Sequence, residues 1–238
     1  MKTYKAKGIV LNSVKYGESG LILYLYTDLF GRQEYIVQGL RSKGKKNSFF
    51  QPLFILDFIG YEPRYGSMHK IKEISLSPPL TTIPFDIRKN TISLFIAELI
   101  YRMVREANCD AKLFEFIHDS IITLDNTNEG ISNFHMWFLV NLTYFLGIYP
   151  GNNYCKDHYF DIIAGEFTKD VSSSHTYFNL EDSEILGKFM NASVSEINDI
   201  KLSGLRRSNF LNSLFTFIGY HTDSINKIKS IDVLKEIF

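Results

Sequence analysis

Hydrophobic and polar residues alternate over short runs in the first third of the chain. Runs of strand length occur at 3–14, 20–27, 32–39, 52–61 and 67–77. Most of the breaks between these runs contain Gly or Pro, which is typical of strands joined by turns. An open five-stranded Greek-key barrel, the OB-fold, fits this number and length of strands. An SH3-like barrel has a similar strand count, so the count alone does not separate the two folds.

A helical period replaces this alternation after a proline-rich segment. Pro78, Pro79 and Pro84 interrupt strands and helices alike, so we predict domains at 1–80 and 81–238. Apolar residues then recur at helical spacing, which predicts helices over 86–106, 111–124, 131–147, 182–190, 194–200, 205–220 and 231–237. The predicted fold class is therefore α+β, with an N-terminal five-stranded OB-fold barrel followed by an all-α domain.

Two details of the helical part are also predicted. Asp182 or Ser183 is the expected N-cap of the helix over 182–190, because a short polar side chain there can accept a backbone N–H. Residues 150–179 have no strong period and are predicted to be an irregular insert between helices.

Charge is distributed unevenly along a chain that is neutral as a whole. The 238 residues contain 26 Lys or Arg and 26 Asp or Glu, but the first 46 contain nine bases against three acids, a local charge of +6. A surface polarised in this way favours a polyanionic partner. No signal peptide or membrane span is evident, and two cysteines give no disulfide framework. We therefore expect a cytoplasmic protein that is not bound to a membrane.

The basic N-terminal segment contains the first candidate site, a surface for nucleic acid. Its predicted phosphate contacts are Lys5, Lys7, Arg32, Arg41, Lys43, Lys45 and Lys46. Its aromatic residues offer candidate stacking surfaces for bases at Tyr16, Tyr24, Tyr26, Tyr35, Phe49 and Phe50. Cations beside aromatic rings are the means by which OB-folds hold single strands. The alternatives are a solvated loop beside core aromatics, or another anionic partner.

A second basic set lies in the acidic remainder of the chain, at Arg206, Arg207, Lys227 and Lys229. Arg206 and Arg207 open a predicted helix, where the helix dipole disfavours cations. They are expected either to meet an anionic partner, DNA or protein, or to pair with acids such as Asp199, which is the simpler interpretation.

No metal site or catalytic site is predicted. Cys155 and His158 have a finger-like C-x-x-H spacing, with His175 further along. A structural zinc site needs four ligands, and neither Asp157 nor Asp161 completes the set convincingly. Phosphate-loop and H-E-x-x-H motifs are absent from the sequence. We therefore expect a non-enzymatic protein without a cofactor.

The order of motifs at both ends resembles the RecO family of bacterial recombination mediators. The matching segments are Gly8–Leu11, Tyr16–Ser19, Leu21–Thr27, Gly31, Gly39–Arg41, Gln51–Leu53, Arg206–Leu211, Tyr220–His221 and Lys229–Leu234. The resemblance implies an OB-fold and a helical domain. Many family members also have a zinc knuckle with two C-x-x-C pairs, of which only Cys155 remains here, with His158 in the partner position.

The resemblance also implies a function. Family members bind single- and double-stranded DNA, anneal complementary strands, and act with RecR to load RecA onto strands coated by single-stranded-DNA-binding protein (SSB). Some bind the acidic C-terminal tail of SSB through the helical domain. A location at the nucleoid would follow. An RNA-binding OB protein and a protein-interaction adaptor are the alternatives that composition leaves open.

Overall fold

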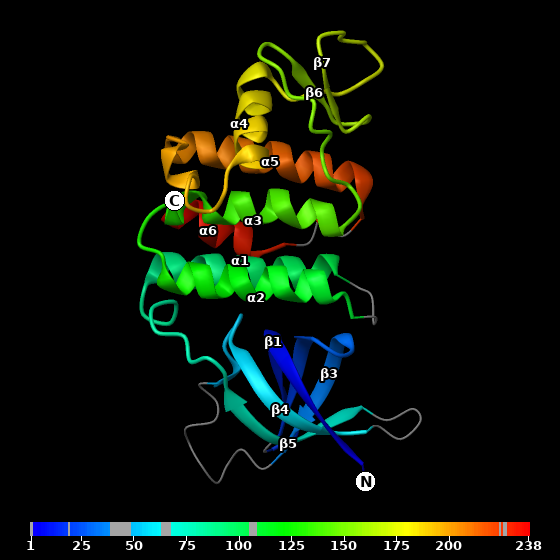
Figure 1. The fold of residues 1–238 in the computed structure, drawn as a ribbon, viewed down its shortest axis with the longest axis vertical. Helices are drawn as coiled ribbons and strands as arrows, with labels where there is room; N and C mark the ends of the chain where they lie inside the picture. Colours follow the sequence, from blue (N-terminus) through cyan, green and yellow to red (C-terminus); the bar gives the residue numbers. More distant parts are fainter. Residues whose placement is uncertain are drawn as a thin grey trace. The chain divides into compact units, whose positions relative to one another are not determined.

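The computed structural model describes residues 2–18, 20–38, 49–62, 68–104, 109–223, 225 and 228–238. Its elements divide between two compact units, Met1–Asn126 and Thr127–Phe238. The first unit contains strands β1 to β5 and helices α1 and α2, and the second contains the remaining elements (Figure 1). Helices α1 and α2 thus belong by packing to the same compact unit as the strands. The domain boundary predicted at residue 80 stays a prediction.

The first unit is built on a closed five-stranded barrel. Its strands are β1 (Thr3–Tyr16), β2 (Gly20–Thr27), β3 (Gly31–Val37), β4 (Ile55–Tyr61) and β5 (His69–Leu76), and their order around the barrel is β1-β2-β3-β5-β4. Only the β3–β5 pair is parallel among these neighbours. The predicted OB-fold is therefore confirmed. Strand β4 begins later than predicted because Leu53, at φ 63°, breaks the extended backbone.

Two helices, α1 (Ile87–Met103) and α2 (Ala111–Asn126), lie side by side in the same unit (Figure 1). Asp86 caps α1 by accepting the backbone N–H of Arg88. The segment that leads into α1 is fixed to the end of α2 by the carboxylate of Asp125, which is only 5 % exposed. That carboxylate accepts the N–H groups of Thr82 and Ile83, each at 2.8 Å.

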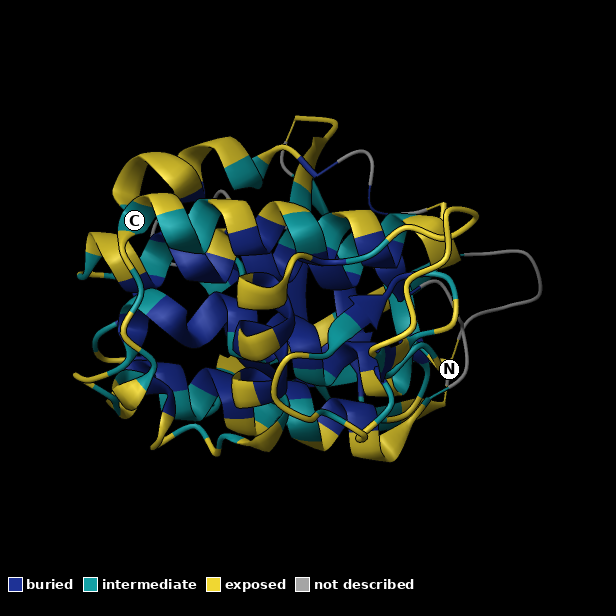
Figure 2. Cartoon of the chain, turned by 90° about the horizontal axis from the view of Figure 1, so that it is seen from above, coloured by how far each residue is buried: buried dark blue, intermediate teal, exposed yellow. Residues whose placement is uncertain are grey.

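The second unit is helical with a small insert, as predicted, except that the helix predicted over 194–200 is only a three-residue 3₁₀ turn. Its elements are α3 (Ile131–Phe145), β6 (Tyr159–Asp161), β7 (Glu166–Thr168), α4 (Leu180–Asn191), the 3₁₀ turn η3 (Ile197–Asp199), α5 (Gly204–His221) and α6 (Ser230–Ile237). The longer helices are buried along one side and exposed along the other (Figure 2). Helix α3 is buried over most of its length. Asn179, and not Asp182 or Ser183, caps α4, because the helix begins three residues earlier than the predicted cap requires.

The insert over 150–179 is more regular than the sequence predicts. Strands β6 and β7 form an antiparallel hairpin, and Asp161 bridges to Tyr177 beside it. Its core is aromatic: the ring centroid of Phe160 lies 5.1 Å from the centroids of Phe167 and Phe178. Strands of three residues are too short to leave a period in the sequence.

Candidate nucleic-acid interface

The outer face of the barrel is covered by helices at one end. On β2, Leu23 and Leu25 point into the barrel and are fully buried, so Ile22, Tyr24 and Tyr26 point outward. Tyr26 stacks on Phe114 of α2, with centroids 6.2 Å apart, and is 1 % exposed. Helix α1 also packs against β1. The helices therefore bury this half of the barrel's outer face.

The cover ends between Tyr24 and Ile22. Tyr24 meets the edge of the Tyr101 ring near the end of α1, with centroids 5.2 Å apart. Ile22, one step further along the outer face, is only partly buried. The helices thus leave the end of the barrel near the β1–β2 turn uncovered on this side.

Strand register brings a row of outward side chains together at this uncovered end. Val14 of β1 pairs with Ile22 of β2, Ile22 pairs with Ile36 of β3, and Ile36 pairs with Lys70 of β5. Paired residues point to the same side of a sheet. Tyr16 lies two positions beyond Val14 on the same face. We call Val14, Tyr16, Ile22, Ile36 and Lys70 the outer row. Val14 is 47 % exposed and Tyr16 is 51 % exposed.

The charges around the outer row are mixed but include several cations. Lys70 and Lys72 are exposed, and Nζ of Lys72 lies 3.0 Å from Oε1 of Glu73. Lys15 is also exposed, but it lies between Val14 and Tyr16 and therefore points to the other face of β1. Glu34 is exposed beside Tyr24. Strand β3 ends at Val37, and the chain continues through Gln38 into residues 39–48. The predicted contacts Arg41, Lys43, Lys45 and Lys46 fall there, outside the described residues.

Arg32 is engaged inside the first unit. Its guanidinium donates a hydrogen bond to the backbone carbonyl of Tyr101 and lies over the Tyr101 ring, with Cζ 5.3 Å from the centroid. Both contacts hold α1 against β3. The Arg32 guanidinium, which was predicted to bind phosphate, therefore holds α1 in place over the barrel.

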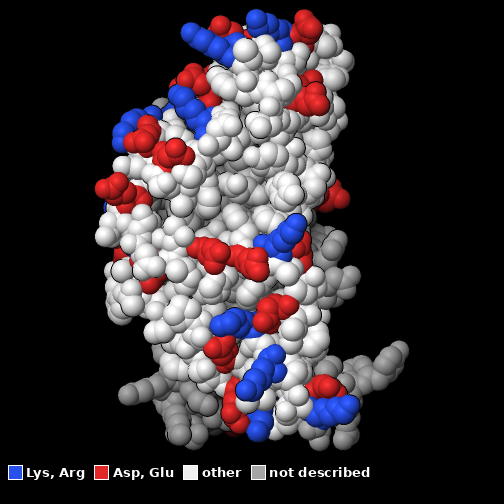
Figure 3. Space-filling model, viewed as in Figure 1, with Lys and Arg blue, Asp and Glu red and all other residues white. Residues whose placement is uncertain are grey.

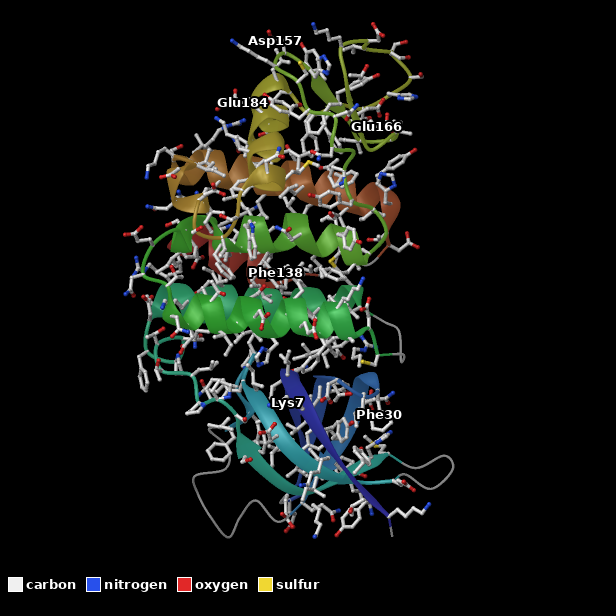
Figure 4. The ribbon with its side chains drawn as sticks, viewed as in Figure 1. Lys7, Phe30, Phe138, Asp157, Glu166 and Glu184 are labelled. Atoms are coloured by element: carbon white, nitrogen blue, oxygen red, sulfur yellow. The ribbon has the colours of Figure 1, made fainter. Side chains whose placement is uncertain are left out.

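Lys5 and Lys7 lie on the β1–β4–β5 side of the barrel, away from the outer row. Nζ of Lys7 is 3.0 Å from Oδ1 of Asp57 (Figure 4 labels Lys7). Burial alone would raise the pKa of the Asp57 carboxyl, but hydrogen bonds from Ser77 and Lys7 and the lysine charge hold that pKa below its ordinary value. Lys5 is exposed.

Both lysines line an open groove of about 620 Å³. Three carboxylates, those of Asp28, Asp57 and Glu73, line the same groove. The view in Figure 3 shows Lys and Arg interspersed with Asp and Glu over the barrel. With carboxylates outnumbering ammonium groups, this groove has no electrostatic preference for phosphate, and we expect Lys5 and Lys7 to contribute less to DNA binding than lysines beside the outer row.

The aromatic candidates differ in how accessible they are. Tyr26, Tyr35 and Phe50 are buried at 1 %, 0 % and 4 % exposure, so their rings belong to the core and are not available for stacking. Tyr24 packs on α1, and Phe49 is partly buried. Among these six aromatic residues, only Tyr16 is exposed to solvent.

Sequence reasoning missed Val14, Ile22, Ile36, Lys70 and Lys72. Their proximity depends on strand register, which the sequence does not give. The one available signal was the run 20–27, which is apolar on both faces; a strand buried on both sides needs a cover, and a cover that ends early leaves an apolar surface.

Arg206 in the second basic set pairs with acids. Its Nε lies 2.6 Å from Oε1 of Glu181, and its Nη2 lies 2.7 Å from Oδ1 of Asp182. Asp182 is 3 % exposed and also accepts the hydroxyl of Ser213. The pairing interpretation fits this geometry, but Asp199 is the wrong partner, because the first turn of α4 brings Glu181 and Asp182 to α5 while Asp199 lies in η3.

The other residues of the second basic set do not form one exposed cluster of positive charge in the part of the chain that the structure describes. Arg207 donates to the carbonyls of Leu202 and Phe238 at 2.6 and 3.0 Å, and burial lowers the pKa of its guanidinium. Lys229 is exposed just before α6, and Lys227 lies outside the described residues. The two arginines are thus committed to contacts within the second unit.

The place of the family's zinc knuckle does not fit a zinc ion. Cys155 is exposed, and Nδ1 of His175 is bonded at 2.5 Å to Oδ2 of Asp161. Asp161 also accepts the N–H groups of Ile163 and Ala164. Across the described part of the chain, no group of three or more His, Cys, Asp or Glu is arranged to hold a metal. The insert is held by aromatic packing and this Asp161 network.

Comparison with known proteins agrees with the barrel and helices. Within the described ranges, no helix has both the length and the apolar character needed to cross a membrane. Residues 1–79 match the family model for the N-terminal part of recombination protein O, and residues 84–230 match the model for its C-terminal part.

Full-length similarity extends to individual relatives. The DNA repair protein RecO of Bacteroides fragilis is 34 % identical over 98 % of both chains. The protein of the same name from Flavobacterium psychrophilum is 31 % identical over 98 % of both chains, and that of Porphyromonas gingivalis is 26 % identical over 98 % of both. The chain therefore belongs to the RecO family of DNA repair proteins.

Proposed function

We propose that this protein is a non-enzymatic recombination mediator that binds single- and double-stranded DNA and anneals complementary strands. The observation that carries the proposal is the outer row, an uncovered apolar surface with lysines beside it on an OB-fold barrel. Family membership supports a role in DNA repair. An OB-fold used in this way binds nucleic acid without bond chemistry.

Annealing has simple physical requirements. Two strands repel each other through their phosphates, and a protein that displaces their counterions lowers that repulsion. The bases must remain free to pair, so the contacts must be few and reversible. Exposed lysines beside the outer row, Lys70 and Lys72, supply charge of this kind.

The proposal includes partners that follow from the family. In it, the protein acts at the nucleoid with RecR to load RecA onto single strands coated by SSB, and the helical unit meets the C-terminal tail of SSB. Annealing of SSB-coated strands, and RecA assembly on such strands with and without RecR, test these steps separately from DNA binding.

The decisive experiment is annealing of complementary oligonucleotides by the wild-type protein, with binding measured over a range of salt. The variant Lys70→Ala/Lys72→Ala is expected to bind single strands more weakly. The slope of log K against log salt should fall in magnitude by up to about 1.4, which is about 0.7 for each phosphate that is no longer neutralised by a lysine. Lys156→Ala/Lys169→Ala is the matched control, because it removes two exposed lysines from the second unit.

Each outcome has a clear meaning. Wild-type protein that neither binds nor anneals DNA would contradict the proposed function. A preference for matched RNA over DNA would identify an RNA-binding OB protein, because a protein can distinguish RNA from DNA by the 2′-hydroxyl. A salt slope that changes equally in both double variants would remove the outer row from the site. A triple variant Lys43→Ala/Lys45→Ala/Lys46→Ala tests the sequence-predicted loop by the same measurement.

A further inference from the structure

Resting on the proposed function, we infer that the outer row is a short base-binding site: it takes two or three unstacked bases of a single strand, with the ring of Tyr16 as the stacking platform. The inference names the substrate of this surface, bases rather than phosphates, and limits its length. Duplex DNA, whose base faces are already stacked, is expected to use other contacts.

The position of Tyr16 leaves its ring open. It pairs across the β1–β2 ladder with Gly20. Gly20 has no side chain, and a Cβ built there would lie 3.8 Å from Cδ1 of Tyr16 and 2.8 Å from its carbonyl oxygen. A larger residue at this position would therefore clash with the backbone carbonyl of Tyr16 and lie against its ring. With Gly20 opposite, the ring is half exposed.

The chemistry of the row favours bases over backbone. Val14, Ile22 and Ile36 offer only aliphatic surface, which gains nothing from contact with phosphate but gains from covering the apolar face of a base. Aromatic stacking on Tyr16 adds to this and does not depend on base identity. Lys70 at the far end of the row is placed to meet a phosphate of the same strand.

The covering helices limit the site along the strands, and the number of strands that the row crosses sets its length. Toward the other end of β2, the next outward residue is Tyr24, which lies against Tyr101. On β3, Arg32 is bonded to the same helix. The apolar part of the outer row crosses β1, β2 and β3, which is two strand spacings or roughly 10 Å. That distance spans at most about three bases, because neighbouring bases are about 3.4 Å apart when stacked and further apart when they are not. A site of this length leaves the rest of the strand free to pair.

The test compares normal and abasic oligonucleotides with wild-type protein and two variants. Tyr16→Ala is expected to weaken binding of a normal single strand about 5- to 150-fold, the range for losing one base–aromatic stack. The salt slope should not change, because no cation is removed. Binding of an abasic strand and of duplex should also be unchanged, which serves as the check that the variant is folded. Tyr16→Phe keeps the ring and should behave as wild type.

A matched control is Tyr220→Ala, which removes an equally exposed tyrosine, 57 % exposed, from the second unit. It should leave all affinities unchanged. The inference is overturned if wild-type protein binds normal and abasic strands equally, or if Tyr16→Ala and Tyr220→Ala have the same effect on the normal strand. Either result leaves the proposed function intact provided that the wild type still anneals DNA, whereas loss of wild-type annealing overturns the proposed function itself.

Discussion

The carboxylate of Asp125 is expected to be a major source of stability in the first unit. It accepts five hydrogen bonds: from the N–H and hydroxyl of Thr81 at 2.8 and 3.0 Å, from the N–H and hydroxyl of Thr82 at 2.8 and 3.2 Å, and from the N–H of Ile83 at 2.8 Å. These bonds fix the segment after the prolines to the end of α2. Lys89, 1 % exposed, donates to the backbone carbonyl of Asp125 at 2.8 Å.

The magnitude follows from what Asp125→Ala leaves behind. Thr81 is exposed and can bond water instead, but the N–H groups of Thr82 and Ile83 are partly or fully buried. Each stranded N–H costs about 1–3 kcal/mol, and Lys89 also loses its nearby countercharge, so we expect about 3–5 kcal/mol in total. That is a large part of the roughly 5–15 kcal/mol typical of a domain. Asp125→Asn keeps one acceptor oxygen and should lose about 1–3 kcal/mol.

The pH dependence provides an independent check. Burial alone would raise the pKa of the Asp125 carboxyl, but the hydrogen bonds from Ile83, Thr81 and Thr82 together hold it below its ordinary value. A lowered pKa in the folded state contributes stability above the unfolded pKa of about 3.9, and that contribution is lost as the pH falls through the folded value. The difference in stability between wild type and Asp125→Asn should therefore shrink below about pH 4.

Urea titration followed by far-UV circular dichroism measures these effects. Asp119→Ala is the control, because Asp119 lies on the same helix and its carboxylate side chain is 78 % exposed. This substitution should change the unfolding free energy by less than about 0.5 kcal/mol. If Asp125→Ala falls within that same limit, the buried network does not stabilise the unit and the reasoning is wrong.

Three further predictions concern other parts of the molecule. Gly60→Ala should destabilise the barrel by about 1–3 kcal/mol in the same titration, because a Cβ there would lie 2.5 Å from Cζ of Tyr4. Arg206→Ala should lower stability by about 3 kcal/mol by leaving buried Asp182 without its cation, while DNA affinity stays unchanged; a change in affinity at constant stability would instead indicate an anionic partner. Elemental analysis of the purified protein should find no stoichiometric zinc, and zinc lost on Cys155→Ser would show that the ligand set around Cys155 has been misjudged.

Periodicity was sufficient to predict most elements of the fold. The run 20–27 and strand β2 coincide, and the helix predicted over 205–220 differs from α5 by one residue at each end. Long runs with a consistent period report directly on which face is buried. The hairpin β6–β7 was not predicted because three residues are too few to define a period.

The candidate site was predicted less completely, for a physical reason. The basic residues of the N-terminal segment could be identified from sequence, but their environments could not. Arg32 braces α1, and Lys7 pairs with Asp57. Both contacts join residues distant in sequence, and Lys70 reaches the outer row only through the parallel β3–β5 pair. Composition identifies the class of partner, whereas tertiary contacts decide which of the cations remain available.

Strand β2 shows why the uncovered end of the barrel calls for a ligand. Leu23 and Leu25 fill the barrel, and Tyr24 and Tyr26 lie under the two helices, so burial accounts for four of its apolar residues. Ile22 neither fills the barrel nor lies under a helix. It points outward, past the end of the helical cover, between two other aliphatic residues on neighbouring strands. Three adjacent apolar side chains with no covering element in the described part of this unit are more economically explained by a transient partner than by packing. A strand of DNA held there by its bases would cover them only while it is bound.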